Sequence, residues 1–178
     1  SDKKVLLLGL DIRNPKLEEY LDVPKVGVTN YLASKDHKNS ADFLTKVEGF
    51  SNFYVMPAGV IPPNPAELLM GKKVGELFEK LKQEFDYIIV DTAPVSLVTD
   101  TLLISKYADA FIYVTRANYL DKRMLTLPEK LYQEKKLPNM SILINDTDST
   151  KGYGYGYGYG YGYGVEVEKK SFWKRFLK

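Results

Sequence analysis

Five short apolar runs divide the first 149 residues, and each has the length of a strand that is buried on both faces. We expect strands at 4–10, 53–56, 86–90, 110–115 and 141–145. None of these runs approaches the ~20 apolar residues that a membrane-spanning helix needs. The N-terminal residues also lack the small-residue cleavage site of a secretory signal. We therefore expect that the chain does not span a membrane by itself and has no targeting segment.

Two segments between these runs carry an Asn followed directly by Pro, which is the pattern of a helix N-cap and first helical residue. They lie at 14–15 and 64–65. The first predicts a short helix that ends at Leu21. The second is strengthened by Glu67, three residues after its Asn, in the arrangement of a capping box.

Three further segments show helical spacing of apolar residues. Between 74 and 85 the apolar positions fall on one side, with Glu and Lys between them, so this helix is predicted to cover one face of a sheet. Further helices are predicted at about 100–106 and 121–136. Pro128 either kinks the last helix or marks its true start.

Strands that alternate with helices through short loops predict a doubly wound, mainly parallel α/β sheet. In such sheets ligands collect at the carboxyl ends of the strands, and both Asp11 and Asp91 follow a predicted strand. This end of the sheet is therefore the first place to look for chemistry.

Charge is unevenly distributed along the chain. The 14 residues from 165 to 178 carry a net charge of +3, whereas the remainder carries −1. A near-neutral body argues against a nucleic-acid partner and directs attention to the basic tail. The chain has no cysteine, so a metal ion would have to be bound by oxygen ligands.

Asp91 ends the apolar run Tyr-Ile-Ile-Val and is followed by Thr-Ala-Pro, which is the arrangement of a Walker B motif. There the carboxylate holds Mg²⁺ beside nucleotide phosphates. An isolated aspartate at this position more often only begins a turn. Here the pairing with Asp11 favours a catalytic and Mg²⁺-binding role for both acids, with Thr92 as a phosphate contact.

The segment around Asp11 adds a cation to this picture. If the strand continues to Arg13, then Gly9, Asp11 and Arg13 share one face, since side chains alternate along a strand. Asp11 would then address Mg²⁺ and Arg13 the phosphate oxygens. The alternative is an ordinary surface pair of Asp and Arg. Asn145, at the end of the last predicted strand, is a weaker candidate for nucleotide contact, because strand-end asparagines more often serve turns.

From residue 150 the composition changes to a strict alternation of tyrosine and glycine. Half of the residues there are glycine, whose backbone entropy opposes a fixed fold, so we expect a disordered tail at 150–164. A basic amphipathic segment follows at 165–178. The tail tyrosines are candidate phosphate acceptors: Tyr153, Tyr155, Tyr157, Tyr159, Tyr161 and Tyr163.

Taken together, these motifs resemble the bacterial tyrosine autokinases that accompany capsular and exopolysaccharide export. Residues 6–15 resemble the Walker A′ motif of that family, 57–69 the segment between its motifs, and 88–94 its Walker B motif. The Tyr-Gly run matches its terminal tyrosine cluster. The resemblance covers nearly the whole chain and implies an incomplete P-loop-type kinase domain at 1–149.

The resemblance further implies a protein-tyrosine kinase that uses ATP and Mg²⁺ and autophosphorylates in trans within a ring-like homo-oligomer. It implies a membrane-spanning polysaccharide co-polymerase region or subunit, the export machinery and a cognate tyrosine phosphatase as partners. The kinase would lie in the cytoplasm at the inner face of the membrane. A partition-type ATPase switch is the alternative within this fold, and a non-catalytic acceptor chain is the alternative outside it.

Two features depart from the family pattern. Gly9 stands where the Walker A′ motif usually has its first acid. The 178 residues also contain no Gly-x-x-x-x-Gly-Lys-Ser/Thr sequence, whose lysine, amides and hydroxyl would bind phosphates and Mg²⁺. We therefore expect weak ATP binding by these residues alone. Because the strand before that loop would lie beside the strand of Asp91, we also expect two unpaired strand edges.

Overall fold

The computed structural model describes residues 2–34 and 39–147 of the chain. The chain divides into two units, Ser1–Asp146 and Thr147–Lys178, and all of the elements below belong to the first. The predicted tyrosine tail and basic segment lie outside the described residues.

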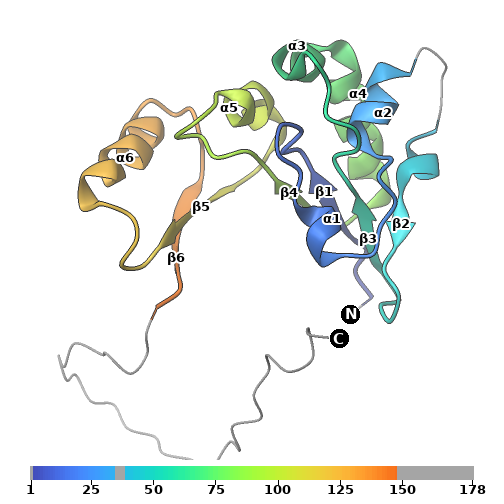
Figure 1. Cartoon of the computed structure of the whole chain (residues 1–178), viewed down its shortest axis with the longest axis horizontal. Helices are drawn as coiled ribbons and strands as arrows, with labels where there is room; N and C mark the ends of the chain where they lie inside the picture. The colour runs from blue at the N-terminus through green and yellow to red at the C-terminus, as the bar shows by residue number, and fades with distance from the viewer. Residues whose placement is uncertain (1, 35–38, 148–178) are drawn as a thin grey trace, which may run out of the picture. The chain divides into compact units, whose positions relative to one another are not determined.

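The first sheet has four strands in the order β2-β3-β1-β4 (Figure 1). β1 (Val5–Gly9) lies between β3 (Phe53–Met56) and β4 (Tyr87–Asp91) and is parallel to both. β2 (Thr45–Lys46) is antiparallel to β3. The predicted mainly parallel α/β sheet is therefore confirmed, with one short antiparallel strand at its edge that the apolar pattern did not indicate.

The core of this unit forms where β1 meets helix α4 (Lys72–Glu84). Leu6 and Leu8 point to the same face because they are two residues apart on a strand, and both are fully buried. The buried residues of α4 recur at helical spacing, as predicted: Val74, Leu77, Phe78 and Leu81. Burial of this apolar surface stabilises the sheet by about 25 cal/mol per Å² removed from water.

Three short helices complete this half of the unit. α1 (Leu17–Tyr20) follows β1, and α2 (Val28–Ala33) packs through Tyr31 against Phe43 at a ring distance of 5.8 Å. Phe43 ends the 3₁₀ helix Ser40–Phe43. α3 (Pro65–Met70) lies between α2 and α4 in the chain and contacts both.

The second sheet contains the parallel strands β5 (Phe111–Arg116) and β6 (Met140–Asn145). α6 (Thr126–Gln133), preceded by the 3₁₀ helix Lys122–Leu125, connects them. Pro128 is buried in the first turn of α6, which confirms that it lies near the start of the helix.

α5 (Asp100–Ile104) and the following 3₁₀ turn Ser105–Tyr107 connect the two sheets. Tyr107 stacks on Phe78 of α4 with ring centroids 4.8 Å apart. α5 also packs against α3. These contacts hold the segment between the two sheets against the core of the first sheet.

β4 and β5 each have one edge without a partner among the described residues, as do β2 and β6 at the other ends of their sheets. The first sheet ends at β4, and β5 is bonded to β6 alone, which confirms the predicted pair of unpaired edges. Apolar side chains near both edges are exposed: Tyr87 (59%), Ile89 (57%), Ile112 (67%) and Val114 (60%). We call these four residues the open face.

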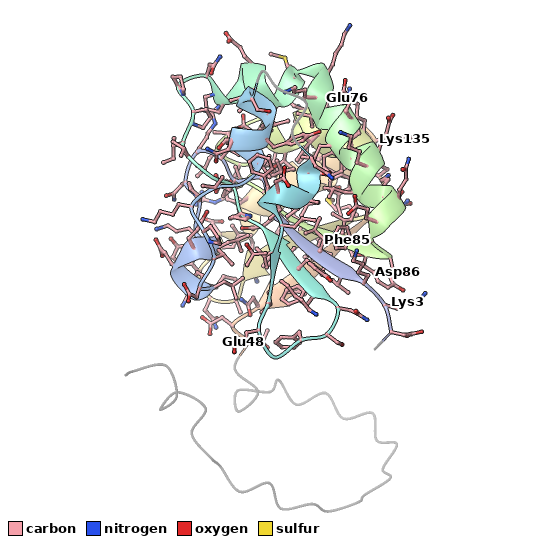
Figure 2. The ribbon with its side chains drawn as sticks, turned by 90° about the vertical axis from the view of Figure 1, so that its right-hand side faces the viewer. Lys3, Glu48, Glu76, Phe85, Asp86 and Lys135 are labelled. Carbon is pink, nitrogen blue, oxygen red and sulfur yellow. The ribbon has the colours of Figure 1, made fainter. Side chains whose placement is uncertain are left out.

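The amino ends of β1 and β4 are held together by Asp86 (Figure 2). Lys3 Nζ donates to Asp86 Oδ1 at 3.0 Å, and the backbone N–H of Lys4 donates to Asp86 Oδ2 at 2.8 Å. The Lys4 N–H first, and then the Lys3 ammonium, lower the pKa of Asp86. The Lys4 ammonium lies over the Phe85 ring at 4.7 Å. This clamp fixes the register at which the two strands begin.

Helix starts were predicted with mixed success. α3 begins at Pro65 after Asn64, as predicted, but the Asn64 side chain does not cap the helix. Its amide donates instead to Glu67 at 2.7 Å, so the capping box is not formed. α1 begins at Leu17 rather than at Pro15, so the helix predicted from residue 14 was placed too early.

Candidate active site at the carboxyl ends of β1 and β4

Asp11 and Asp91 lie at the same end of two neighbouring parallel strands. Asp91 is the last residue of β4 and is in register with Gly9, the last residue of β1. The backbone N–H groups of Leu10 and Asp11 both donate to the Asp91 carbonyl, at 2.7 and 3.1 Å. These bonds fix the loop after β1 against the end of β4.

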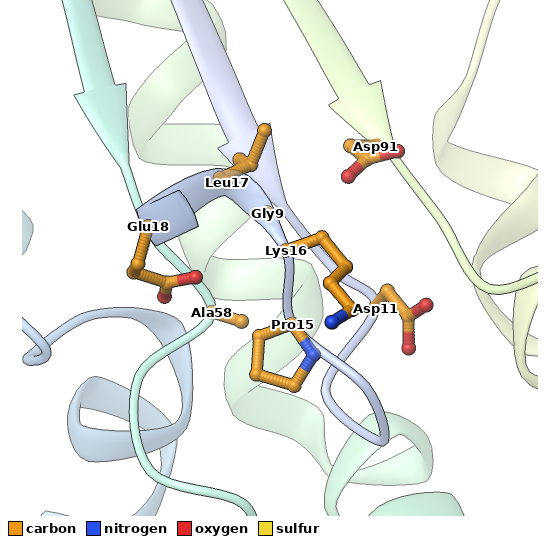
Figure 3. A pocket seen from close by; sticks show the side chains of 8 residues that line it. All are labelled: Gly9, Asp11, Pro15, Lys16, Leu17, Glu18, Ala58 and Asp91. Atoms are coloured by element: carbon orange, nitrogen blue, oxygen red, sulfur yellow. The ribbon is translucent and has the colours of Figure 1, made fainter. Parts of the chain in front are cut away.

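Both acids line one small pocket, which Figure 3 shows from close by. Asp91 stands at the tip of β4, and Asp11 lies in the loop beyond β1. The other lining residues come from the end of β1, the loop after it, α1 and the segment after β3: Gly9, Pro15, Lys16, Leu17, Glu18 and Ala58. The pocket therefore collects two carboxylates at the position where this class of sheet binds ligands.

The Asp11 carboxylate is oriented by its own loop. Its Oδ1 accepts hydrogen bonds from the N–H groups of Arg13 and Asn14, at 3.3 and 3.0 Å. β1 ends at Gly9, so Asp11 and Arg13 do not continue the strand. The expectation that Gly9, Asp11 and Arg13 share a strand face was therefore wrong. A turn closed by the Asp11 side chain replaces the extended backbone.

The pKa of Asp91 is raised above its ordinary value. Partial desolvation by the surrounding protein is the larger cause, and the nearby negative charge of Asp11 is the smaller. The negative charge of Asp11 disfavours ionisation of Asp91, and a bound cation would offset this repulsion. The electrostatics of the pocket therefore favour positive charge.

Arg13 does not face the pocket as a free phosphate ligand. Its Nε and Nη2 donate to the two carboxylate oxygens of Asp100 at 2.6 and 3.0 Å. This pairing raises the pKa of Arg13. Sequence reasoning missed Asp100, because 87 residues separate the two partners and no local pattern connects them.

Gly9 has a steric reason for its identity. A Cβ atom there would lie 2.9 Å from the backbone N of Ala58, and 3.1 Å from Leu17 Cδ1. Backbone cannot move away easily, so this position has no room for the acid that usually opens the Walker A′ motif. In this chain one acid of that motif remains, Asp11.

The other predicted contacts are placed less centrally. Thr92 follows Asp91 and is half-buried. Asn145 ends β6 in the second sheet, is exposed, and is not among the residues that line the pocket. Its Oδ1 accepts from the Asp146 N–H at 2.9 Å, and its carbonyl accepts from the Ala117 N–H at 2.9 Å. The first is a local turn contact, and the second continues the pairing of β5 with β6.

Lys16 and Glu18 line the pocket although the motifs did not single them out. Lys16 forms an ion pair with Glu19 on α1. Lys16 lies five residues after Asp11, which is a candidate metal-binding acid. This short distance in sequence is the signal that could have identified Lys16.

The donor set suits a magnesium ion bound in part by the nucleotide. Mg²⁺ prefers oxygen, and its sites commonly use one or two carboxylates together with substrate phosphates. Asp11 and Asp91 provide two. Within residues 2–34 and 39–147, no cluster of three or more His, Cys, Asp or Glu forms a metal cage. The pocket therefore fits a Mg²⁺ ion that is bound partly by the nucleotide better than one bound by protein side chains alone.

Known tyrosine kinases resemble this chain over most of its length. It is 31% identical over 149 residues to the tyrosine-protein kinase CpsD of Streptococcus agalactiae serotype III, covering 83% of this chain and 63% of CpsD. It is 33% identical over 155 residues to the tyrosine-protein kinase ptk of Acinetobacter johnsonii, covering 86% of this chain and 21% of ptk. No family model matches the sequence.

Solved structures agree with these relatives. The kinase domain of the Escherichia coli tyrosine kinase ETK superposes with a TM-score of 0.75 at 28% identity, covering 89% of this chain and 61% of that one. In both sequence and fold, the chain is therefore similar to bacterial tyrosine-protein kinases. A ParA family ATPase from Chlorobium tepidum, with a TM-score of 0.65 at 19% identity, shares the fold alone.

The match to these tyrosine-protein kinases is partial in length. The chain spans less than two thirds of the CpsD relatives and about a fifth of ptk. In the part of the chain that the structure describes, no helix has the length and apolar character to cross a membrane.

Proposed function

We propose that this chain forms the acid-bearing part of a tyrosine autokinase domain, which transfers the γ-phosphoryl group of ATP to tyrosines of its own tail. The observation that carries the proposal is the pair Asp11 and Asp91, which line one pocket at the ends of adjacent parallel strands. Relatives that match over this region are named tyrosine-protein kinases.

Asp91 and Asp11 would hold Mg²⁺, which neutralises phosphate charge when it is bound. The other task of the pocket is to position the phenol in line with the γ-phosphorus. A new bond then forms between the phenol oxygen and that phosphorus, while the bond to the bridging oxygen of ADP breaks. The phenol proton passes to a pocket carboxylate, as in other kinases that use an aspartate for this purpose.

Phosphate binding would depend on groups that these 178 residues do not contain, since they have no Gly-x-x-x-x-Gly-Lys-Ser/Thr loop. The paired Arg13 does not replace that lysine, because Asp100 already neutralises it. We expect Mg²⁺·ATP to bind the chain alone only weakly. Calorimetry that measured tight binding to the 178 residues would contradict this expectation.

The acceptors would be the six tyrosines from Tyr153 to Tyr163, presented in trans to a neighbouring copy. Glycine on either side leaves each phenol unobstructed. Each phosphate adds about −1.5 to −2 charges, so two modified sites would offset the +3 of residues 165–178. We therefore expect unmodified tails to favour association, and modified tails to repel one another.

The decisive experiment uses this chain extended at its front by the loop-bearing strand–loop–helix unit of a relative. Replacing all six tail tyrosines with phenylalanine should abolish most of the phosphotyrosine signal after incubation with Mg²⁺ and ATP. Tyr107→Phe combined with Tyr113→Phe is the matched control and should leave the signal intact. The acceptor assignment would be wrong if most of the label remained in the tail variant.

A non-catalytic acceptor is the second candidate, because the six tail tyrosines could accept phosphate from a complete kinase without any chemistry of this chain. A pure acceptor gains phosphotyrosine only when a complete homologue is added. Incubating the 178-residue chain with Mg²⁺ and ATP, alone and with that homologue, separates the two candidates. The partition-type switch has less support, because its representative here shares only the fold.

The partners we propose follow from the family. They are further copies of the chain, a membrane-spanning co-polymerase region or subunit, the polysaccharide export machinery and a tyrosine phosphatase. The place of action would be the inner face of the cell membrane, and the process the synthesis of capsular or extracellular polysaccharide. Co-purification from membranes with a tagged chain tests this set.

A further inference from the structure

α5 begins with two buried polar side chains that reach different loops. Asp100 and Thr101 are only 2% and 5% exposed. Asp100 binds the Arg13 guanidinium through both carboxylate oxygens, at 2.6 and 3.0 Å. The Thr101 hydroxyl donates to the Ala93 carbonyl at 2.8 Å. Two adjacent residues of one helix thus bind the loop of Asp11 and the loop of Asp91.

The contacts form a closed circuit around the pocket. Asp11 accepts the N–H of Arg13, Arg13 binds Asp100, and Ala93 lies two residues beyond Asp91. The Asp91 carbonyl closes the circuit, because it accepts hydrogen bonds from the N–H groups of Leu10 and Asp11. Breaking any one connection would leave the spacing of the two acids less constrained.

The geometry makes Arg13–Asp100 the strongest connection in this circuit. The guanidinium fork matches the carboxylate with two parallel bonds, which fixes direction as well as distance. The Asp100 carboxylate is almost completely removed from water, so it would be left buried and unpaired if Arg13 moved away. This penalty holds the Asp11 turn in place.

We propose that Asp100 and Thr101 are positioning residues, which hold Asp11 and Asp91 in the relative arrangement that a shared Mg²⁺ requires. The proposal rests on the proposed function for its purpose, and on the hydrogen bonds of Asp100 and Thr101 for its mechanism. Neither residue lines the pocket, and both act through the loops that do.

Amide hydrogen exchange of the full 178-residue chain, followed by NMR, tests the mechanism. In Asp100→Asn the charge is lost and the shape is kept, so we expect the Arg13 and Asn14 amides to exchange at least about tenfold faster. The Val55 amide in β3 should keep its rate. Asp109→Asn, on an exposed carboxylate that pairs only loosely with Lys82 at 4.0 Å, is the matched control and should change neither.

Unchanged exchange at Arg13 and Asn14 would overturn the proposal. Equal acceleration at Val55 would also overturn it, because that result describes general destabilisation instead of local positioning. If Asp100→Asn does not fold, Arg13→Lys gives the same comparison, since lysine keeps the charge but loses the two-pronged geometry.

A second measurement tests whether this positioning serves metal binding. Mn²⁺ replaces Mg²⁺ as a paramagnetic probe, and water-proton relaxation reports its affinity for the chain. We expect Asp100→Asn to weaken Mn²⁺ binding about five- to tenfold, and Thr101→Val to weaken it less. Unaltered affinity in both variants would remove the metal from the proposal. If the unmodified chain binds no Mn²⁺, the proposed function loses its metal site, while the exchange experiment still decides the positioning role.

Discussion

The two sheets are built from similar apolar sequences but differ in what covers them. Leu6 and Leu8 on β1 are fully buried beneath α4, whereas Ile112 and Val114 on β5 are largely exposed. β1 has a strand on either side, and β5 has β6 alone. An apolar strand sequence therefore specifies a strand, but burial depends on neighbours that come from elsewhere.

The largest difference between the sheets should appear on truncation of a single side chain. Leu8→Ala removes a fully buried group and should cost about 2–5 kcal/mol of unfolding free energy. Val114→Ala, on the open face, should cost less than about 1 kcal/mol. Urea denaturation followed by circular dichroism measures both. Equal costs would mean that the open face is covered in solution.

The next largest effect should come from supplying a partner strand to the free edges of β4 and β5. A front extension with one strand–loop–helix unit from a relative should pair both free edges and raise the melting temperature by at least about 5 °C. The same unit with two prolines in its strand cannot pair fully and serves as the control. Identical melting temperatures for the extended and original chains would count against the sheet topology described here.

A charge on the open face should change association more than stability. Val114→Lys should alter the free energy of unfolding by about 0.5 kcal/mol or less, since the position is exposed. Lysine on a free edge opposes pairing with other edges, so light scattering should show less aggregation. Val55→Lys is the contrast, because that residue is fully buried and the variant should not fold.

The smallest expected effect concerns the charge of Asp91. Its pKa is raised in the folded state, so the folded protein binds more protons than the unfolded chain and its stability falls as pH rises through that range. Asp91→Asn removes this loss and should raise the melting temperature at pH 7 by about 1 °C. The gain should disappear below the ordinary aspartate pKa. A gain that persisted at pH 3 would point to another cause.

The sequence predicted the parts of the fold that depend on local pattern. The strand at 53–56 and the helix from Pro65 were placed correctly, because apolar runs and an Asn-Pro start act over a few residues. The start of α1 was missed because the Asp11 carboxylate binds the amides of Arg13 and Asn14. That turn keeps the backbone from entering a helix at Pro15.

The site was predictable to the same extent. Asp11 and Asp91 could be identified because each follows a strand, and parallel strands bring such ends together. The partner of Arg13 could not, since Asp100 is distant in sequence and looks like an ordinary helix-starting aspartate. Two unpaired strand edges were expected from the missing loop, but the four exposed side chains of the open face became apparent only in three dimensions.

The Asp86 clamp has a practical consequence for attaching the protein to a surface. Lys3 and Lys4 are tied to Asp86 at the amino ends of β1 and β4, whereas Asp11 and Asp91 lie at the carboxyl ends. Five residues of strand separate these ends by about 16 Å. A biotin or fluorophore placed before Asp2 would therefore leave the pocket pointing into solution, which makes the amino terminus the better site for immobilisation.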